Sequence, residues 1–300
     1  MRNYLIESAD SYHKNKFLVN NISTDSNLLK LTNNIFTLVN DTIIKLTTND
    51  DINICSKSII DLLEKYKNCN DENLFMYCLD ILIKMIHKKS VSYIEENKKI
   101  YYIYCLFIHN ISKKYNIVND YFIQFTCYIC PYVIPKLYNI KEFNNDKLEF
   151  KKRYGFINDQ QSINEFLNNI KGNSYCFFSY IYATINEKDK HDFKLNSELY
   201  INEYLTALLD KNIINEYDYP IVSNFICFLD VFGNYLYNKN NSNLVSAYKY
   251  VIKHCESLKK NVTALKTMRS TINSNIFILN NLIKLIENKT NTPFINDTKS

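Results

Sequence analysis

The sequence predicts an all-α protein, a single domain built as a HEAT-like or α-solenoid stack of about 11–12 helices. From Leu28 onward, apolar residues recur at helical spacing. No segment alternates apolar and polar residues for long, as a half-buried strand would. The links between the helical stretches are short, so neighbouring helices can bury their apolar stripes against each other. No consensus recurs at a fixed period, so we expect any repeats to be degenerate.

Composition sets limits on the protein class. The chain has 300 residues, 46% of them hydrophobic, and a formal net charge of +5. This length is ample for a large core, and the charge is too mild to indicate a nucleic-acid-binding protein. No window approaches the roughly 18 consecutive apolar residues of a membrane helix. Nine cysteines lie mostly among apolar residues and no signal peptide is visible, which indicates a reducing compartment, the cytosol or nucleus.

Helical elements follow in order after a polar N-terminus. Residues 1–26 are predicted to be a loose polar tail with room for one short helix, and residues 27–296 the helical domain. The segment 72–88 carries one apolar stripe. The segment 99–108, KIYYIYCLFI, is β-prone by composition, but its helical flanks favour a buried helix. The stripe of segment 72–88 consists of Leu74, Cys78, Ile81, Leu82 and Met85.

Prolines and glycines divide the second half of the chain. A helix that begins near Val118 is expected to end at Pro131 and Pro135, because proline lacks the backbone donor that continues a helix. Residues 136–159 are irregular, and Gly172 and Pro220 are expected to mark helix starts or turns. Two more helical stripes follow, and Pro293 ends the ordered part. These stripes are Val222, Phe225, Ile226, Leu229, Gly233 and Leu236, then Ile276, Leu279, Ile283 and Ile286.

The pair Cys127-x-x-Cys130 permits a redox, zinc or packing interpretation. A redox pair needs its first cysteine at a helix N-terminus, where the dipole lowers the thiol pKa, whereas this pair ends a predicted helix. A zinc site needs a second pair of ligands. The nearest candidates, Cys105 and His109, belong to an apolar helical run. The packing interpretation is therefore favoured.

Catalytic signatures are absent from the sequence. One polar run could be taken for a catalytic group, but it lies between two helical patterns, where a solvated turn is the more common interpretation. The run consists of Asp189, Lys190, His191 and Asp192. Three glycines in the whole chain exclude the glycine-rich phosphate loops. No His-Glu-x-x-His or Gly-x-Ser-x-Gly motif occurs. Active sites often need glycine for tight backbone approach, so this scarcity of glycine counts modestly against an enzyme.

Two basic clusters are candidates for holding a polyanion. Lys84, His87, Lys88 and Lys89 follow the apolar stripe of segment 72–88, and Lys84 and Lys88 stand one helical turn apart. The second cluster is Lys151–Arg153. On charge alone, a solvated lysine face is the more common explanation in a lysine-rich chain.

Several sparse motifs, taken in order, resemble the C-terminal domain of the Gle-one family of nuclear-pore mRNA export factors. The resemblance is clear over residues 115–295 and vague over 60–115. All three glycines of the chain fall on the family's glycine positions. The motifs are CPYVIPKLYN, FKKRYGF, FLNNIKG, YCFFSYIYA, FLDVFGNYLYN and a final Thr-Pro-Phe. The residues that match the family's structural motif are Cys130, Pro131, Pro135, Gly155, Gly172, Gly233 and Asn234.

The chain departs from the family pattern in two ways that concern its fold. A helix with a Trp-x-x-Leu-Ala pattern corresponds best to LYINEYLTALLD, where Tyr200 or Tyr204 replaces tryptophan. The family's long N-terminal coiled coil has no counterpart here. Gly233 within a helical stripe costs about 1 kcal/mol relative to alanine, so we expect another helix to cross closely at Gly233–Asn234.

The resemblance implies a non-enzymatic activator at the cytoplasmic face of the nuclear pore, in nucleus and cytoplasm. Such proteins bind the RecA-like lobes of a DEAD-box RNA helicase and stimulate its ATPase. An FG nucleoporin docks on their C-terminal half. No cofactor is required, and neither sequence-specific nucleic-acid binding nor a membrane span is expected. The alternatives are a generic HEAT-like adaptor with a different client, and an enzyme with an unrecognised all-α site.

The resemblance also concerns inositol hexakisphosphate, which can bridge such proteins to their helicase. Family members hold it with basic residues on two neighbouring helices. A Lys-x-x-x-His pattern is matched loosely by Lys84 and Lys88, with His87 beside them. The lysine pair before Cys-Pro is replaced by Tyr128 and Ile129. Unless Lys136 or the Lys151–Arg153 cluster compensates, we expect weak binding or none.

Overall fold

The computed structural model describes residues 1–24, 26, 28–92, 99–134, 161, 163–186, 195–209, 219–239, 242–261, 277 and 280. Within these ranges the chain forms ten α-helices and one 3-10 turn, without a strand. The predicted all-α class and single domain are therefore confirmed. No described helix is long and apolar enough to cross a bilayer.

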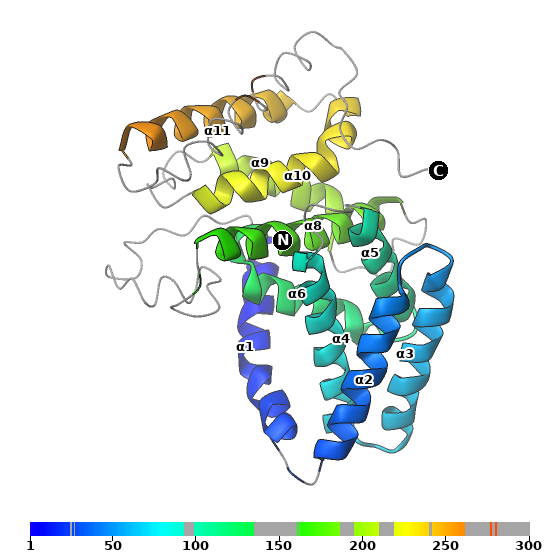
Figure 1. Cartoon of the computed structure of the whole chain (residues 1–300). Helices are drawn as coiled ribbons and strands as arrows, with labels where there is room; N and C mark the ends of the chain where they lie inside the picture. The colour runs from blue at the N-terminus through cyan, green and yellow to red at the C-terminus, as the bar shows by residue number, and fades with distance from the viewer. Residues whose placement is uncertain are drawn as a thin grey trace.

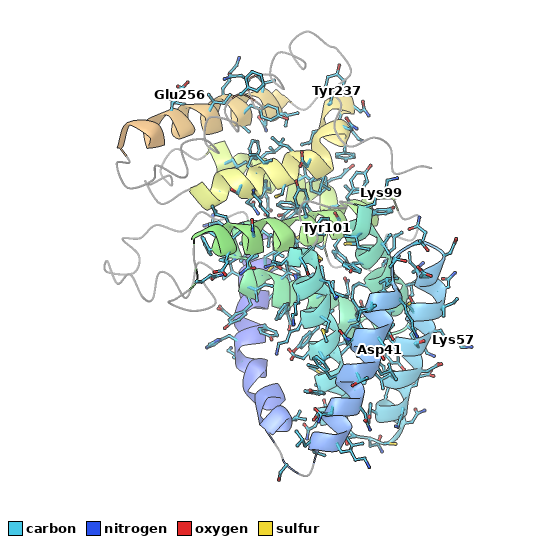
Figure 2. The ribbon with its side chains drawn as sticks, in the orientation of Figure 1. Asp41, Lys57, Lys99, Tyr101, Tyr237 and Glu256 are labelled. Carbon is cyan, nitrogen blue, oxygen red and sulfur yellow. The ribbon has the colours of Figure 1, made fainter. Side chains whose placement is uncertain are left out.

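Six helices make up the N-terminal part of the stack. They are α1 (Arg2–Thr24), α2 (Leu29–Lys45), α3 (Asp51–Asn68), α4 (Glu72–Ser92), α5 (Lys99–Ser112) and α6 (Ile117–Ile129). α4 lies at their centre and packs against α1, α2, α3 and α6. Asp41 on α2 and Lys57 on α3 point outward, because these two helices form an outer side of the stack (Figure 2).

The C-terminal part is stacked on one long helix. After the 3-10 turn η1 (Pro131–Val133) come α8 (Ile163–Asn186), α9 (Ser197–Leu209), α10 (Tyr219–Asn238) and α11 (Ser242–Asn261). Figure 1 shows α8 lying across the N-terminal helices, with α9, α10 and α11 on its other side. α8 packs against α4, α5 and α6, and also against α9 and α10. It therefore joins the two parts of the molecule.

The N-terminus differs from the loose tail that the sequence predicts. Residues Arg2–Thr24 form α1, which packs along α6 and α4. Leu5, Ser8 and Tyr12 are spaced at i, i+3 and i+7 and are buried on this helix. Because the buried stripe is narrow and includes a serine and a tyrosine, hydrophobic periodicity does not reveal it. The Tyr12 ring contacts the rings of Tyr121 and Phe125 on α6, with centroids 5.6 and 5.1 Å away.

The stripes predicted for α4 and α5 are confirmed. Leu74, Cys78, Leu82 and Met85 are buried on α4, and Ile81 is partly buried. The segment 99–108 is helical, as its flanks indicated, and lies within α5. Tyr101, which is labelled in Figure 2, shows how the aromatic residues of α5 are used. Its ring stacks on that of Tyr175 of α8, with the centroids 5.3 Å apart.

The predicted stop after α6 is confirmed at Pro131. The backbone N–H of Cys130 makes the last hydrogen bond, to the Thr126 carbonyl at 2.9 Å, and Pro131 has no N–H to continue the ladder. η1 follows immediately. Pro135 and residues 136–159 lie outside the described residues. Pro220 falls in the first turn of α10, as expected for a residue that marks a helix start.

The expectation that Gly172 marks a helix start or turn is wrong. Gly172 lies inside α8, where that helix crosses the C-terminal end of α4. A Cβ at this position would lie 2.7 Å from Val91 Cα and 2.9 Å from Val91 N. Glycine is thus required by a close helix crossing, the role that the sequence suggested for Gly233.

The stripe on α10 is buried at Phe225, Leu229 and Leu236, and Ile226 is partly buried. Gly233 is buried in the same helix, and Asn234 is partly exposed. The close crossing expected at Gly233–Asn234 stays a prediction. Gly155, all four residues of the stripe 276–286 and Pro293 lie outside the described residues.

Candidate functional site

α4 carries the basic residues that the sequence indicated, and their side chains differ in exposure to solvent. Lys84 is half-buried, Lys88 is exposed and Lys89 is partly exposed. Lys84 Nζ lies 2.5 Å from Asp80 Oδ2, one helical turn earlier. Lys88 is therefore the best exposed of these cations, and Lys84 already has a carboxylate partner.

His87 does not join the two lysines. Its side chain is buried, with Nδ1 at 2.9 Å from Asn173 Oδ1 and Nε2 at 2.9 Å from Thr126 Oγ1. Because an amide oxygen can only accept, Nδ1 carries the proton in the bond to Asn173. Burial lowers the pKa of His87 to about 4. The ring is neutral near pH 7 and links α4 to α6 and α8.

Asp80 is the centre of a second buried polar cluster, which sequence reasoning missed. Its side chain is 1% exposed, and its Oδ1 accepts hydrogen bonds from Tyr12 at 3.0 Å and Tyr121 at 2.9 Å. Burial and the adjacent carboxylate raise the pKa of both hydroxyls, so they remain donors. The cluster joins α1, α4 and α6, and Lys84 supplies its positive charge. An acidic residue within an apolar run was the signal that could have revealed it.

The family motif around Gly172 connects three helices. Gly172 contacts Ser90 and Val91 of α4, and Asn173 binds His87 of the same helix. Ser174 Oγ accepts a hydrogen bond from Asn224 Nδ2 of α10 at 2.6 Å and lies 3.6 Å from Cys130 Sγ. Asn173, Ser174 and Asn224 were not predicted. Polar residues directly after a helix-crossing glycine are the signal that indicates them.

The two cysteines of Cys127-x-x-Cys130 are packing residues. Both are buried, at 1% and 0% exposure. Burial raises the pKa of the Cys127 and Cys130 thiols, whereas a redox-active cysteine needs a lowered pKa. Across the described residues, no group of three or more His, Cys, Asp or Glu side chains could hold a metal ion. The run 189–192 lies outside the described residues.

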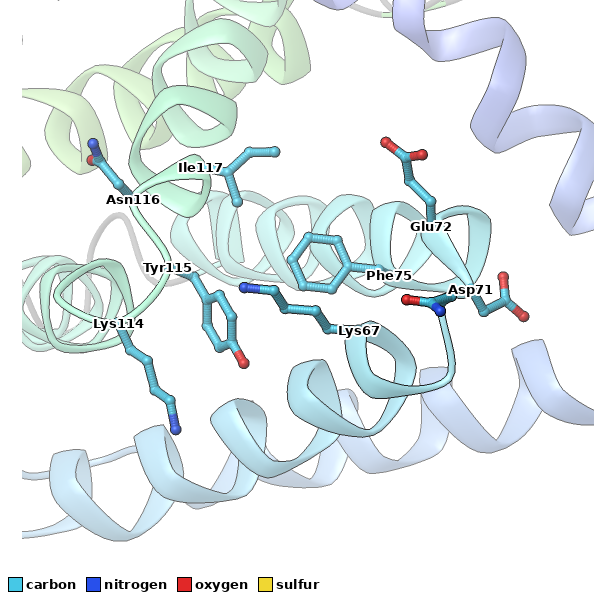
Figure 3. Close-up of a pocket in the computed structure, with 9 residues that line it drawn as sticks. Lys67, Asp71, Glu72, Phe75, Lys114, Tyr115, Asn116 and Ile117 are labelled. Carbon is cyan, nitrogen blue, oxygen red and sulfur yellow. The ribbon is translucent and has the colours of Figure 1, made fainter.

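A cavity of about 550 Å³ lies between the α3–α4 turn and the α5–α6 turn. Figure 3 shows Lys67 reaching towards the rings of Tyr115 and Phe75, with Asp71 and Glu72 on the other side. Lys67 Nζ lies 5.1 Å from the Tyr115 ring centroid, and Lys114 is ion-paired to Glu64. Because charges of both signs line this cavity, its chemistry does not favour a polyanion.

Comparison with known proteins gives one family and one fold. A family model described as GLE1-like protein matches residues 10–252. Two solved structures from S. cerevisiae match with a TM-score of 0.70 and 14% identity. Both contain the Dbp5 C-terminal domain bound to Gle1 and IP6, one of them with a substituted Gle1. The matches cover 95% and 97% of this chain, and 94% and 97% of the matched chains. At this identity they show a shared fold. No curated protein matches the chain.

Proposed function

The chain belongs to the GLE1-like protein family, and from this premise we propose that it is an mRNA export factor that binds a DEAD-box RNA helicase and stimulates its ATPase. The support is the family match over residues 10–252, together with a fold shared over nearly the whole chain with proteins solved in complexes of Gle1 and Dbp5. The proposed activity is regulatory, and the helicase performs the hydrolysis.

A stack of helices can regulate a two-lobed helicase only through unequal binding. The chain must bind the open arrangement of the lobes more tightly than the closed one, because equal affinity shifts no equilibrium. A rigid activator preserves more of this difference in binding free energy, because it deforms less when it binds. The buried polar clusters at Asp80 and His87, each joining three helices, favour such rigidity.

We further propose that the protein acts at the cytoplasmic face of the nuclear pore, and that an FG nucleoporin docks on its C-terminal half. Both follow from the family resemblance. Imaging of a fluorescently tagged chain, together with binding of a purified FG nucleoporin to the chain, tests this part of the proposal.

ATPase stimulation is the decisive test of the main proposal. The RNA-dependent ATP turnover of the cognate DEAD-box helicase is measured with increasing amounts of the purified chain. We expect the turnover of the helicase to rise to a plateau, and the chain alone to show no turnover. An unrelated helical protein at equal concentration is the control. A helicase rate that stays at its basal value, or ATP hydrolysis by the chain alone, would overturn the proposal.

A second candidate function, a HEAT-like adaptor with a different client, is favoured by one surface feature. Leu29, Phe36 and Ile44 on α2 are 53%, 45% and 53% exposed. Large apolar residues exposed along one helix suit a protein partner. A pull-down with the immobilised helicase separates the two functions, because an adaptor for another client would leave the helicase in the supernatant.

For inositol hexakisphosphate, we propose weak binding or none. Of the three residues matched to the family's anion-binding helix, His87 is buried and neutral and Lys84 is paired to Asp80. Lys88 is the exposed cation that remains, and one exposed charge pair contributes about 0–1 kcal/mol. Calorimetric titration at physiological salt, with and without helicase, tests this. Submicromolar affinity that is lost in Lys88→Ala would establish a working site instead.

A further inference from the structure

We propose that Asp80 withholds Lys84 from surface anions, so that anion binding at Lys84 and the docking of α1 oppose each other. This inference rests on the proposed weak anion binding at α4 and gives a structural cause for that weakness. It makes the N-terminal helix α1 part of the control of that site, although α1 carries none of the candidate anion ligands.

The geometry gives Asp80 two distinct sets of partners. Oδ1 accepts hydrogen bonds from Tyr12 of α1 and Tyr121 of α6. Oδ2 is buried, and within the described residues its one polar partner is Lys84 Nζ, 2.5 Å away. Hydroxyl groups stabilise a carboxylate but do not neutralise it. Lys84 is thus the cation that makes this buried charge tolerable.

Lys84 is also the member of the cluster that can leave. Its side chain is 38% exposed, whereas that of Asp80 is 1% exposed. A multivalent anion near Lys84 and Lys88 would draw the flexible lysine towards solvent. Asp80 would then be left without its cation in a site closed to water, which is strongly unfavourable for a carboxylate. This free-energy cost falls when the cluster opens to water. The part that opens includes Tyr12 and the segment of α1 around it.

Thermodynamic linkage fixes the sign of the reciprocal effect. If anion binding weakens the docking of α1, then docking of α1 weakens anion binding by the same factor. The intact chain is therefore in its low-affinity state for anions at Lys84. Undocking of α1, or removal of the charge on Asp80, produces the high-affinity state.

The experiment uses the whole chain and inositol hexakisphosphate as the probe. Asp80→Asn keeps an oxygen that can accept from both tyrosines and removes the negative charge. We expect its affinity for the probe to exceed that of the wild type by about fivefold or more. Hydrogen exchange of the α1 amides is then measured with and without saturating probe. It should accelerate in the wild type and stay unchanged in Asp80→Asn.

The exchange measurement separates linkage from simple charge removal, since deleting any nearby carboxylate raises anion affinity. Probe binding to the wild type with unaltered α1 exchange would overturn the linkage and leave the proposed site standing. Equal affinity of the wild type and Asp80→Asn for the probe would also overturn the linkage. Absence of binding to both proteins would overturn the linkage alone, because it agrees with the proposed loss of inositol hexakisphosphate binding.

A second set of variants tests the role of Lys84 without any anion. Lys84→Met should accelerate α1 exchange, and adding Asp80→Asn to it should restore slow exchange. Lys88→Met is the matched control, one turn along the same helix and exposed, and should leave α1 exchange at the wild-type rate. Unchanged exchange in Lys84→Met would show that Lys84 does not secure the cluster, and the inference would fail at its first step.

Discussion

At the scale of single residues, His87 shows how a buried titratable group makes folding depend on pH. Its pKa is lowered from 6.5 to about 4 by burial. Between these values the unfolded chain binds the proton and the folded chain does not. Stability is therefore lost as the pH falls from about 6.5 towards 4.

The variant His87→Gln should reduce this loss. For a difference of about 2.5 pKa units, the wild type loses at most about 3 kcal/mol more than the variant between pH 7 and pH 4. Urea denaturation of both proteins at pH 7 and pH 4.5 measures the difference. Parallel pH dependence in the two proteins would contradict the buried neutral state of His87.

The close helix crossing at Gly172 predicts that a single added methyl group destabilises the protein. The Cβ of Gly172→Ala would lie 2.7 Å from Val91 Cα, a backbone atom that cannot rotate away. We expect a loss of about 1–3 kcal/mol through overpacking, seen as a lower melting temperature. A gain in stability, which alanine normally brings to a helix interior, would contradict the close crossing.

Gly233→Leu is the companion variant at the other buried helical glycine. The sequence predicts a loss of a few kcal/mol, on the order of other overpacked cores. Differential scanning calorimetry of both variants compares the two positions directly. An unchanged melting temperature for Gly233→Leu would leave Gly172 as the family glycine that marks a crossing.

His87 also shows what the sequence can and cannot predict about the site. The pattern of Lys84, His87 and Lys88 suggested one basic face. His87 follows Ile83 and Leu79 at four-residue spacing, and both are fully buried, so the periodicity contained part of the answer. The rest depends on how many sides of α4 are covered by other helices. That is a property of tertiary packing, which no local pattern specifies.

At the scale of helices, the stop after α6 is held by α9. The Tyr200 hydroxyl donates a hydrogen bond to the Val133 carbonyl of η1 at 2.6 Å. Tyr200 is fully buried, and its ring contacts Phe177 at 5.6 Å. Tyr200, one of the two tyrosines expected in place of the family's tryptophan, thus joins a core cluster and fixes the turn after Pro131.

Tyr200→Phe should leave a buried carbonyl without its partner. We expect a loss of about 1–2 kcal/mol and faster hydrogen exchange around Cys130–Ile134. The matched control is Tyr182→Phe on α8, a partly buried tyrosine whose hydroxyl makes no hydrogen bond within the described residues. Equal effects of the two variants would argue against a specific role for the Tyr200 hydroxyl.

Helix α1 marks the limit of sequence-based prediction at this scale. The stripes of α4, α5 and α10 contain enough aliphatic residues to be recognised. On α1 the buried face includes Ser8 and Tyr12, and the hydroxyl of Tyr12 reaches Asp80. A helix that docks through a buried polar group has weak apolar periodicity, so its sequence resembles that of a tail.

At the scale of the whole molecule, thiol reactivity reports whether the core is closed. Of the eight cysteines whose side chains the structure describes, Cys69 alone is exposed. A thiol reagent should therefore label Cys69 within the described residues first, and Cys69→Ser should remove that rapid phase. The cysteines of the α6 end should react only after denaturant is added. Rapid labelling of Cys127 or Cys130 in native protein would contradict the packing described for α6 and η1.

The all-α class was predictable because helical periodicity is a local property. The arrangement around α8 was not, because periodicity identifies helices without their pairing. Gly172, Asn173 and Ser174 were visible as a motif, and their contacts with α4 and α10 became clear only in the assembled stack. Sequence-based prediction was least accurate for the candidate anion site, since the charges available there depend on neighbours that are distant in sequence.

The pairing of α1 with α6 has a consequence for how the chain is made. Tyr4 contacts Asp120 across a sequence separation of 116 residues. A ribosome adds about 5–20 residues per second, so roughly 6–23 s pass between synthesis of the two partners. During that interval α1 has no α6 to cover Leu5 and Tyr12. Nascent α1 is therefore a natural substrate for chaperones, and slowed translation before residue 129 should increase aggregation of the newborn chain.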